Sequence, residues 1–341
     1  MTGIADVAAR AGVSPATASR ALTGRGYVAA ATRLRVETAA RELGYAASSS
    51  AAGLVTGRTR TIGVVMPSLT RWFFAEVLEG VQHALLEHRY DLALYSAPSD
   101  SALRRAMFDF FLTRKRLDGI IAIGIEPSAH ELERLISFAR PVVSVGGHHL
   151  GTSAVSIDDR AAARIATEHL IGLGHRDIAF LGGDPDGRHT SFGDGMRLAG
   201  YRDAMHEAGL DAFVRHTRCV VSMPGGYGAG ATLLADRRRR PTGLVGVCDE
   251  VAVGAIIAAR RLGIRVPSDL SVIGIDDHHY AEMFSLTTLQ QRPFDQGVAA
   301  VQLLMRQLED PDAAPERIHD AAPIVMRGTT AAHASSLAPV D

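Results

Sequence analysis

Cysteine and long apolar runs are scarce in this 341-residue chain. Its two cysteines, Cys219 and Cys248, are too few for a disulfide-stabilised scaffold or for a cysteine-rich zinc site. No stretch of about eighteen consecutive apolar residues occurs, so we predict no membrane-spanning helix and no membrane partner. The N-terminus also lacks the basic and then apolar pattern of a secretory signal. Together these absences indicate a protein of the reducing cytoplasm.

Signatures of catalysis are missing as well. No G-x-G-x-x-G motif follows the first predicted strand, which argues against a nicotinamide-linked enzyme. No paired acid and base, and no nucleophile with an adjacent base, stands out. His148-His149 and His278-His279 follow apparent strand ends, but a third or fourth ligand at a metal-binding spacing is not evident. We therefore expect no enzymatic activity, no cofactor and no metal site.

Positive charge is concentrated at the N-terminus. Residues 1–60 contain eight arginines and only three acidic residues, a formal charge of +5, although the whole chain carries −1. The rest of the chain is therefore acidic, which indicates that the basic part binds a polyanion and the body does not. A chain of this length also exceeds one compact core, so we expect two or three structural units.

The first 45 residues are predicted to form three short helices. Apolar residues recur at helical spacing over 4–11, and Gly12 interrupts the pattern. Ser14-Pro15 indicates the start of a second helix, because serine caps free N–H groups and proline suits the first turn. A third helix is predicted over 30–43. Its inner side is predicted to consist of Leu34, Val36, Ala40 and Leu43. This arrangement is typical of a helix-turn-helix domain.

The chain changes character after residue 45. Residues 46–59 are rich in Ala, Ser and Gly and are typical of a hinge linker, either flexible or weakly helical. From 60 to 330, short apolar runs alternate with helical segments, which indicates a doubly wound parallel α/β domain, followed by a tail over 331–341. The runs predicted as strands are Ile62–Met66, Leu92–Tyr95, Gly119–Ile123, Val142–Val145, Ile178–Leu181, Val220–Val221, Leu244–Val247 and Val272–Ile275.

This number of strands favours two Rossmann-like lobes over one large sheet. The predicted lobes are approximately 60–160 plus 290–325, and 161–289. Several of the apolar runs end in small or acidic residues, such as Cys248-Asp249 and Asp276-Asp277. Parallel sheets bind ligands at the carboxyl edge of their strands, so two lobes with facing edges would enclose a binding cleft.

Ordered motifs through the chain carry a specific resemblance. In the head they are Ile4-Ala5-Asp6-Val7-Ala8-Ala9-Arg10-Ala11-Gly12-Val13-Ser14, Thr17-Ala18-Ser19-Arg20-Ala21-Leu22 and Glu42-Leu43-Gly44-Tyr45. In the body they are Arg197-Leu198-Ala199-Gly200-Tyr201, Asp249 to Gly254, Val266 to Gly274, and Leu286 to Gln291. Over residues 3–330 the chain resembles the LacI/GalR family of bacterial transcription regulators. The resemblance implies an all-α helix-turn-helix head plus a two-lobed, periplasmic-binding-protein-like (Rossmann-like) α/β effector domain.

The resemblance also implies roles in binding a double-stranded DNA operator. Pro15, Ala16 and Arg20 match base-reading positions, and the arginine fork suits the two acceptors of guanine. Thr17, Ser19 and Thr32 match phosphate contacts. Leu54 matches a minor-groove wedge that bends DNA. The alternatives remain a solvated surface arginine at 20 and an incidental apolar linker residue at 54.

In the body, the resemblance implies an effector site between the lobes. Arg197 and Asp276 match positions that bind a ligand's hydroxyls or polar edge, which suits a sugar. The other matching positions are Trp72, Phe73, Cys248, Asp249 and Gln291. Cysteine departs from the asparagine that the family often has at position 248, so one polar contact is missing or replaced. The aromatic residues could instead belong to the core.

Several alternatives stay open at this point. The resemblance implies a homodimer, and hence a near-palindromic operator. A sugar-binding protein of the same architecture without DNA function is the nearest alternative, and a regulator sensing a purine or another non-sugar metabolite is the next. Whether the effector acts as inducer or corepressor is open, as is helix formation in the hinge.

Overall fold

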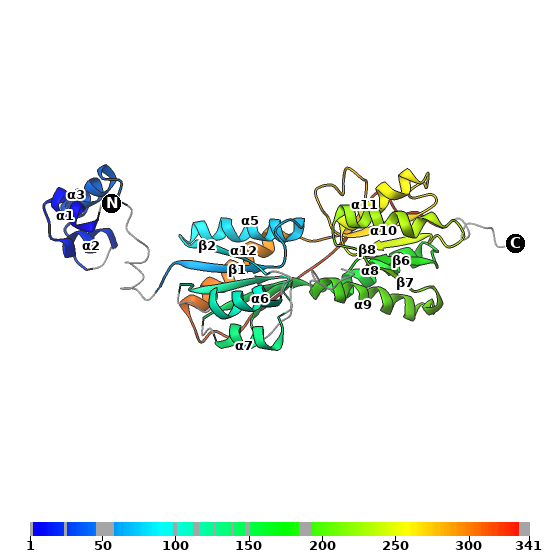
Figure 1. Cartoon of the computed structure of the whole chain (residues 1–341), viewed down its shortest axis with the longest axis horizontal. Helices are drawn as coiled ribbons and strands as arrows, with labels where there is room; N and C mark the ends of the chain where they lie inside the picture. The colour runs from blue at the N-terminus through cyan, green and yellow to red at the C-terminus, as the bar shows by residue number, and fades with distance from the viewer. Residues whose placement is uncertain are drawn as a thin grey trace. The chain divides into compact units, whose positions relative to one another are not determined.

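The computed structural model describes residues 3–23, 26–45, 58–97, 101–111, 116–125, 127–137, 140–146, 151–183 and 192–333. The chain divides into two compact units, residues 1–61 with 116–118, and 62–115 with 119–341 (Figure 1). Leu54, His148-His149 and most of the predicted hinge and tail lie outside the described residues.

The head contains α1 (Ile4–Ala11), α2 (Pro15–Thr23) and α3 (Ala30–Glu42). Gly12 ends α1 in a left-handed conformation with a φ of 66°, which glycine adopts without a steric penalty. Ser14 Oγ accepts a hydrogen bond from Thr17 N at 3.2 Å, so the predicted cap of α2 is present. The prediction that Leu34 faces inward was wrong, because its side chain is 60% exposed. It lies two residues, about 200°, round the helix from buried Val36.

The first lobe is built on a six-stranded sheet in the order β11-β5-β4-β3-β1-β2. Its strands are β1 (Thr61–Met66), β2 (Asp91–Ser96), β3 (Gly119–Ile123), β4 (Val142–Val145), β5 (Ser153–Ile157) and β11 (Arg317–Asp320). Its helical segments are α5 (Trp72–Glu87), α6 (Ser101–Ala106), the π-helix η1 (Met107–Phe111), α7 (Ala129–Ser137) and α12 (Pro293–Glu309). Helices α5 and α12 cover one face of the sheet, and α6 and α7 lie on the other (Figure 1).

Glycines allow α5 and α12 to cross with their backbones in contact. A Cβ added at Gly80 would lie 2.0 Å from the carbonyl oxygen of Phe294, and one at Gly297 would lie 2.2 Å from that of Val77. No larger residue fits at either position without moving a helix. This crossing fixes the α5 end that carries residues 72–74.

The second lobe repeats this plan with the order β12-β10-β9-β8-β6-β7. Its strands are β6 (Ile178–Leu181), β7 (Arg215–Thr217), β8 (Gly243–Gly246), β9 (Ser271–Asp276), β10 (Thr287–Gln290) and β12 (Ile324–Val325). Its helical segments are α8 (Asp159–Gly172), α9 (Phe192–Glu207), the 3₁₀ segment η2 (Asp211–Phe213), α10 (Met223–Ala235) and α11 (Asp249–Arg261). The pairs α8/α9 and α10/α11 lie on opposite faces (Figure 1).

Several details differ from the sequence prediction, and strands β5, β7, β10, β11 and β12 lie outside the predicted runs. Val220–Val221 is not a strand: Ser222 caps α10 by accepting from Gly225 N, and the seventh strand lies earlier, at β7. Strand β5 was missed because serines interrupt its apolar pattern, although all five of its residues are buried. The predicted first lobe included residues through 325, but β12 pairs with β10 of the second sheet. The chain therefore passes between the lobes three times, after β5, β10 and β11.

Candidate functional site

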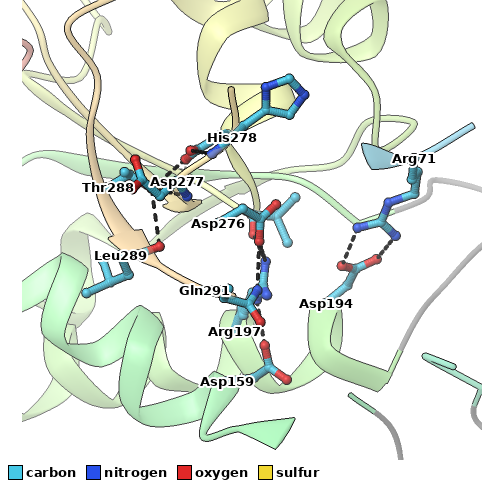
Figure 2. Close-up of polar contacts among 12 residues, drawn as sticks. Arg71, Asp159, Asp194, Arg197, Asp276, Asp277, His278, Thr288, Leu289 and Gln291 are labelled. Carbon is cyan, nitrogen blue, oxygen red and sulfur yellow. Dashed lines mark hydrogen bonds and ion pairs between the residues drawn. The ribbon is translucent and has the colours of Figure 1, made fainter. Parts of the chain in front are cut away.

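Arg197 on α9 is the centre of a buried polar cluster in the second lobe (Figure 2). Its Nε donates to Asp159 Oδ1 at 2.8 Å and its Nη1 donates to Val247 O at 2.7 Å. Nη1 also lies 3.4 Å from Asp276 Oδ1. Burial acts to lower the pKa of Arg197, but the nearby carboxylates outweigh it, and the pKa lies above its usual value. The guanidinium is thus permanently charged and held in one orientation.

Asp276, at the end of β9, is the second member of this cluster. Its backbone has a φ of 135°, a region that non-glycine residues rarely adopt and that costs energy to maintain. Gln291 Nε2 donates to Asp276 Oδ1 at 2.8 Å, and Gln291 N donates to Asp276 O at 3.1 Å. Gln291 follows β10, where the chain turns back towards the first lobe, so it couples the carboxylate to the crossover.

A small cavity lies over this cluster, with a volume of about 20 Å³, close to the space that one water molecule needs. Its lining consists of Arg71, Phe73, Phe74, Gly146, Ile157, Asp159, Gly193, Asp194, Arg197, Asp276 and Gln291. Four of the predicted effector residues, Phe73, Arg197, Asp276 and Gln291, are among them. The structure does not place Trp72, Cys248 or Asp249 in this lining.

Sequence reasoning missed Arg71, Asp159 and Asp194. Asp159 lies two residues after the end of β5, as the first residue of α8, and its position at a carboxyl edge would have been visible had that strand been recognised. The other two form an ion pair across 123 residues of sequence, and no local pattern reports such a pairing.

Trp72 links the lobes beside the cavity. Its Nε1 donates to His279 Nδ1 at 3.4 Å, and its ring centroid lies 4.8 Å from that of His278. His279 Nε2 in turn lies 3.7 Å from Glu76 Oε1 on α5. Trp72, which was predicted to stack on a ligand, therefore contacts histidines of the second lobe instead. Within the described residues, no three His, Cys, Asp or Glu side chains form a group that could hold a metal ion.

Cys248 and Asp249 are buried and lie outside the lining of the cavity. Cys248 precedes α11, is 1% exposed, and its thiol pKa is raised by burial. Asp249 accepts hydrogen bonds from Thr288 Oγ1 at 2.6 Å and from His278 N at 2.9 Å. These contacts fasten the segment after Asp276 to α11 and β10, so Asp249 positions the cluster.

The Asp249 carboxyl should make stability depend on pH. Burial, and then the charge of Asp276, raise its pKa to about 8. Between its unfolded pKa, about 4, and that value, the folded protein holds a proton that the unfolded chain has lost, so stability falls as pH rises by up to about 1.4 kcal/mol per unit. The Asp249→Asn variant lacks this titrating group and so does not lose stability in this way. We expect urea unfolding to show that its free energy of unfolding, relative to that of the wild type, rises from pH 5 to pH 8.

Asp269→Asn is the matched control for that measurement. The hydrogen bonds from Arg265 hold the pKa of the Asp269 carboxyl far below its usual range. The contribution of this carboxyl to stability therefore changes with pH only in more acidic solution. Between pH 5 and pH 8 the stability difference of this variant should stay constant. If the stability difference between Asp249→Asn and the wild type is equally independent of pH, the raised pKa of Asp249 is contradicted.

The exposed side of α2 is the candidate DNA-binding surface. Pro15, Ala16, Ser19 and Arg20 are all exposed, whereas Ala18 and Ala21 are buried in the head core. Arg20 Nε donates to Ala16 O at 3.2 Å along the helix. The Thr17 hydroxyl lies 2.9 Å from Ser14 Oγ. Thr17 and Thr32 are half-buried. Tyr27, in the segment after α2, is 95% exposed.

Comparison with known proteins decides the family. Residues 3–48 match the family described as bacterial regulatory proteins, lacI family, and residues 167–330 match the periplasmic binding protein-like domain. The HTH-type transcriptional regulator DegA of Bacillus subtilis is 35% identical over 300 residues, which cover 85% of this chain and 86% of the relative. The chain belongs to the lacI family. It is a DNA-binding transcriptional regulator with an effector domain, and the family is not enzymatic.

Two further similarities agree with this assignment. The HTH-type transcriptional repressor PurR of Pectobacterium atrosepticum is 34% identical over 314 residues, covering 89% of this chain and 90% of the relative. The solved complex of the transcriptional regulator CelR with cellobiose is 27% identical, covers 96% of this chain and all of that chain, and gives a TM-score of 0.69. Among the described helices, none has the length and apolar character needed to cross a bilayer.

Proposed function

We propose that this lacI-family member is a cytoplasmic homodimeric repressor whose affinity for a near-palindromic operator is set by a sugar bound over Arg197 and Asp276. The observation that carries the proposal is the buried cluster of Arg197, Asp159 and Asp276, which lines one cavity together with Phe73. Fixed guanidinium and carboxylate groups donate to and accept from adjacent hydroxyls, and an aromatic face suits the apolar side of a pyranose. The CelR complex, which holds cellobiose, gives a precedent on a similar fold.

For the DNA contact, we propose that α2 enters the major groove. Arg20 reads a guanine, and Pro15 and Ala16 offer only apolar contact, suited to a thymine methyl. Thr17, Ser19 and Thr32 bind phosphates. Tyr27 joins them, because its exposed hydroxyl can donate to a phosphate oxygen. Leu54 serves as the minor-groove wedge.

Communication between the two sites follows from dimer geometry. Effector binding changes how the lobes meet, which shifts one first lobe relative to its partner and alters the spacing of the two heads. Half-site spacing is fixed by the DNA helix, so a small shift changes operator affinity. An exposed apolar groove of the first lobe, lined by Leu69, Leu78, Leu86 and Leu94 among others, supports dimer formation there.

The effector class is tested by thermal unfolding of the full-length protein with a panel of mono- and disaccharides and of purines. A ligand at about 100 times its Kd stabilises the folded state by about 2.7 kcal/mol, enough to raise the Tm measurably. We expect at least one sugar to raise the Tm and to change operator affinity. Stabilisation by a purine and by none of the sugars would show the alternative effector class.

A further inference from the structure

Arg71 reaches from the first lobe into the second. It lies immediately before α5, and its Nη1 and Nη2 each lie 3.4 Å from one carboxylate oxygen of Asp194, in the first turn of α9 (Figure 2). The two side chains are only 13% and 3% exposed. A two-pronged ion pair of this burial is geometrically specific, unlike the solvated pairs on the surface.

The Arg71 side chain occupies the place where an effector would bind. It lines the same small cavity as Arg197 and Asp276, and its guanidinium carbon lies 4.9 Å from the centre of the Phe74 ring. Its buried Nε has no hydrogen-bond partner among the residues that the structure describes. A buried donor without a partner is costly, so this occupant fills the cleft imperfectly.

Charge balance explains why a cation lies there. Three carboxylates line the cavity, those of Asp159, Asp194 and Asp276, against the two guanidiniums of Arg71 and Arg197. Without Arg71 the imbalance would grow, and buried like charges repel strongly. Burial acts to lower the pKa of Arg71, but Asp194 and the other nearby negative charges hold it above its usual value. A further anion entering this cleft would meet a site that already carries excess negative charge.

We propose that the Arg71 guanidinium is a tethered occupant of the cleft, which holds the lobes together on Asp194 and which an effector must displace with hydrogen-bond donors of its own. The effector class is therefore neutral or positively charged, such as a polyol or an amino sugar, and not a phosphate or carboxylate. The restriction on effector class rests on the proposed function of the cleft, whereas the Arg71–Asp194 link in the ligand-free protein is independent of it.

The only tryptophan of the chain reports on this contact. Trp72 is adjacent to Arg71 and bonded to His279 of the second lobe, so parting of the lobes exposes the indole. In the ligand-free full-length protein we expect Arg71→Ala and Asp194→Asn to red-shift the emission and roughly double its quenching by acrylamide. Far-UV circular dichroism checks that both variants are folded.

A small guanidinium ion tests whether the Arg71 side chain acts as an occupant of the cleft or only as an ion-pair link between the lobes. Low-millimolar methylguanidinium should restore the wild-type emission of Arg71→Ala, whereas potassium chloride at the same concentration should not. The emission of Asp194→Asn should not respond to methylguanidinium, because the carboxylate that accepts from the guanidinium has been replaced by an amide. Arg160→Ala is the matched control: it removes the ion pair with Asp203 inside the second lobe and should leave the emission unchanged.

Three outcomes would overturn the proposal or one of its parts. Unchanged emission in both Arg71→Ala and Asp194→Asn would overturn the proposal while leaving the effector function untouched, since no effector is used. Exposure of the indole without recovery in methylguanidinium would overturn the occupant role. Inorganic phosphate should leave the wild-type emission unchanged. A saturable shift with phosphate would overturn the exclusion of anions.

Discussion

Replacing Arg20 by alanine is expected to lower the affinity of the full-length protein for its operator by roughly 5- to 150-fold per half-site, the size of one good bidentate arginine–guanine contact. A dimer has two half-sites, so the losses multiply. Arg20 is exposed on α2, and its Nε already donates to Ala16 O. The terminal Nη groups therefore remain for the base, in the fork geometry that matches guanine.

The measurement needs an operator, which selection from a random duplex library with the wild-type protein supplies. Fluorescence anisotropy at one salt concentration then compares the selected and random duplexes, because phosphate contacts depend steeply on salt. Arg10→Ala is the control: Arg10 lies outside α2 and pairs with Glu42 at 2.7 Å, so operator affinity should change little. An equal loss on both duplexes for Arg20→Ala would assign Arg20 to phosphate contact instead of base reading.

Replacing Arg197 by leucine should cost about 3–5 kcal/mol of unfolding free energy, the usual result of removing one partner from a buried ion pair. The loss is large because Asp159 and Asp276 would both lose their buried guanidinium, and Val247 O would lose its donor. Response to any effector should disappear as well. Lysine should not restore either property, because one ammonium cannot donate along three directions fixed by a planar fork.

Urea unfolding followed by Trp72 emission measures this loss in the body. Arg164→Ala is the matched control, since Arg164 forms its ion pairs with Glu168 and Glu207 in solvent, where such pairs contribute little. Equal stability of Arg197→Leu and Arg164→Ala would mean that the buried cluster is not held by its guanidinium.

The head was predictable because its signals are local. Gly12 and the cap at Ser14 depend on neighbours a few residues away. The exposed Leu34 was misassigned because apolar character alone does not report which side of a helix faces the core. Strand β5 was missed for the opposite reason, since buried serines look polar in sequence.

The cleft was predictable in part. The resemblance gave Arg197, Asp276 and Gln291, which the structure brings together. It did not give the pairing of Arg71 with Asp194, because that contact depends on how two separately folded sheets meet. Asp249 follows a strand as ligand-binding carboxylates do, but its two hydrogen bonds are to the protein's own Thr288 and His278.

The three passages between the lobes also determine when each part can form during synthesis. Among the described residues, the fully buried core of the head lies between Val7 and Ala40, so the head can fold soon after it leaves the ribosome. Neither lobe has this freedom. The first sheet lacks its edge strand until Arg317–Asp320 emerges, and the second still needs Ile324–Val325 and Thr329. A nascent chain therefore carries a finished DNA-binding head well before it has a sensor to control it.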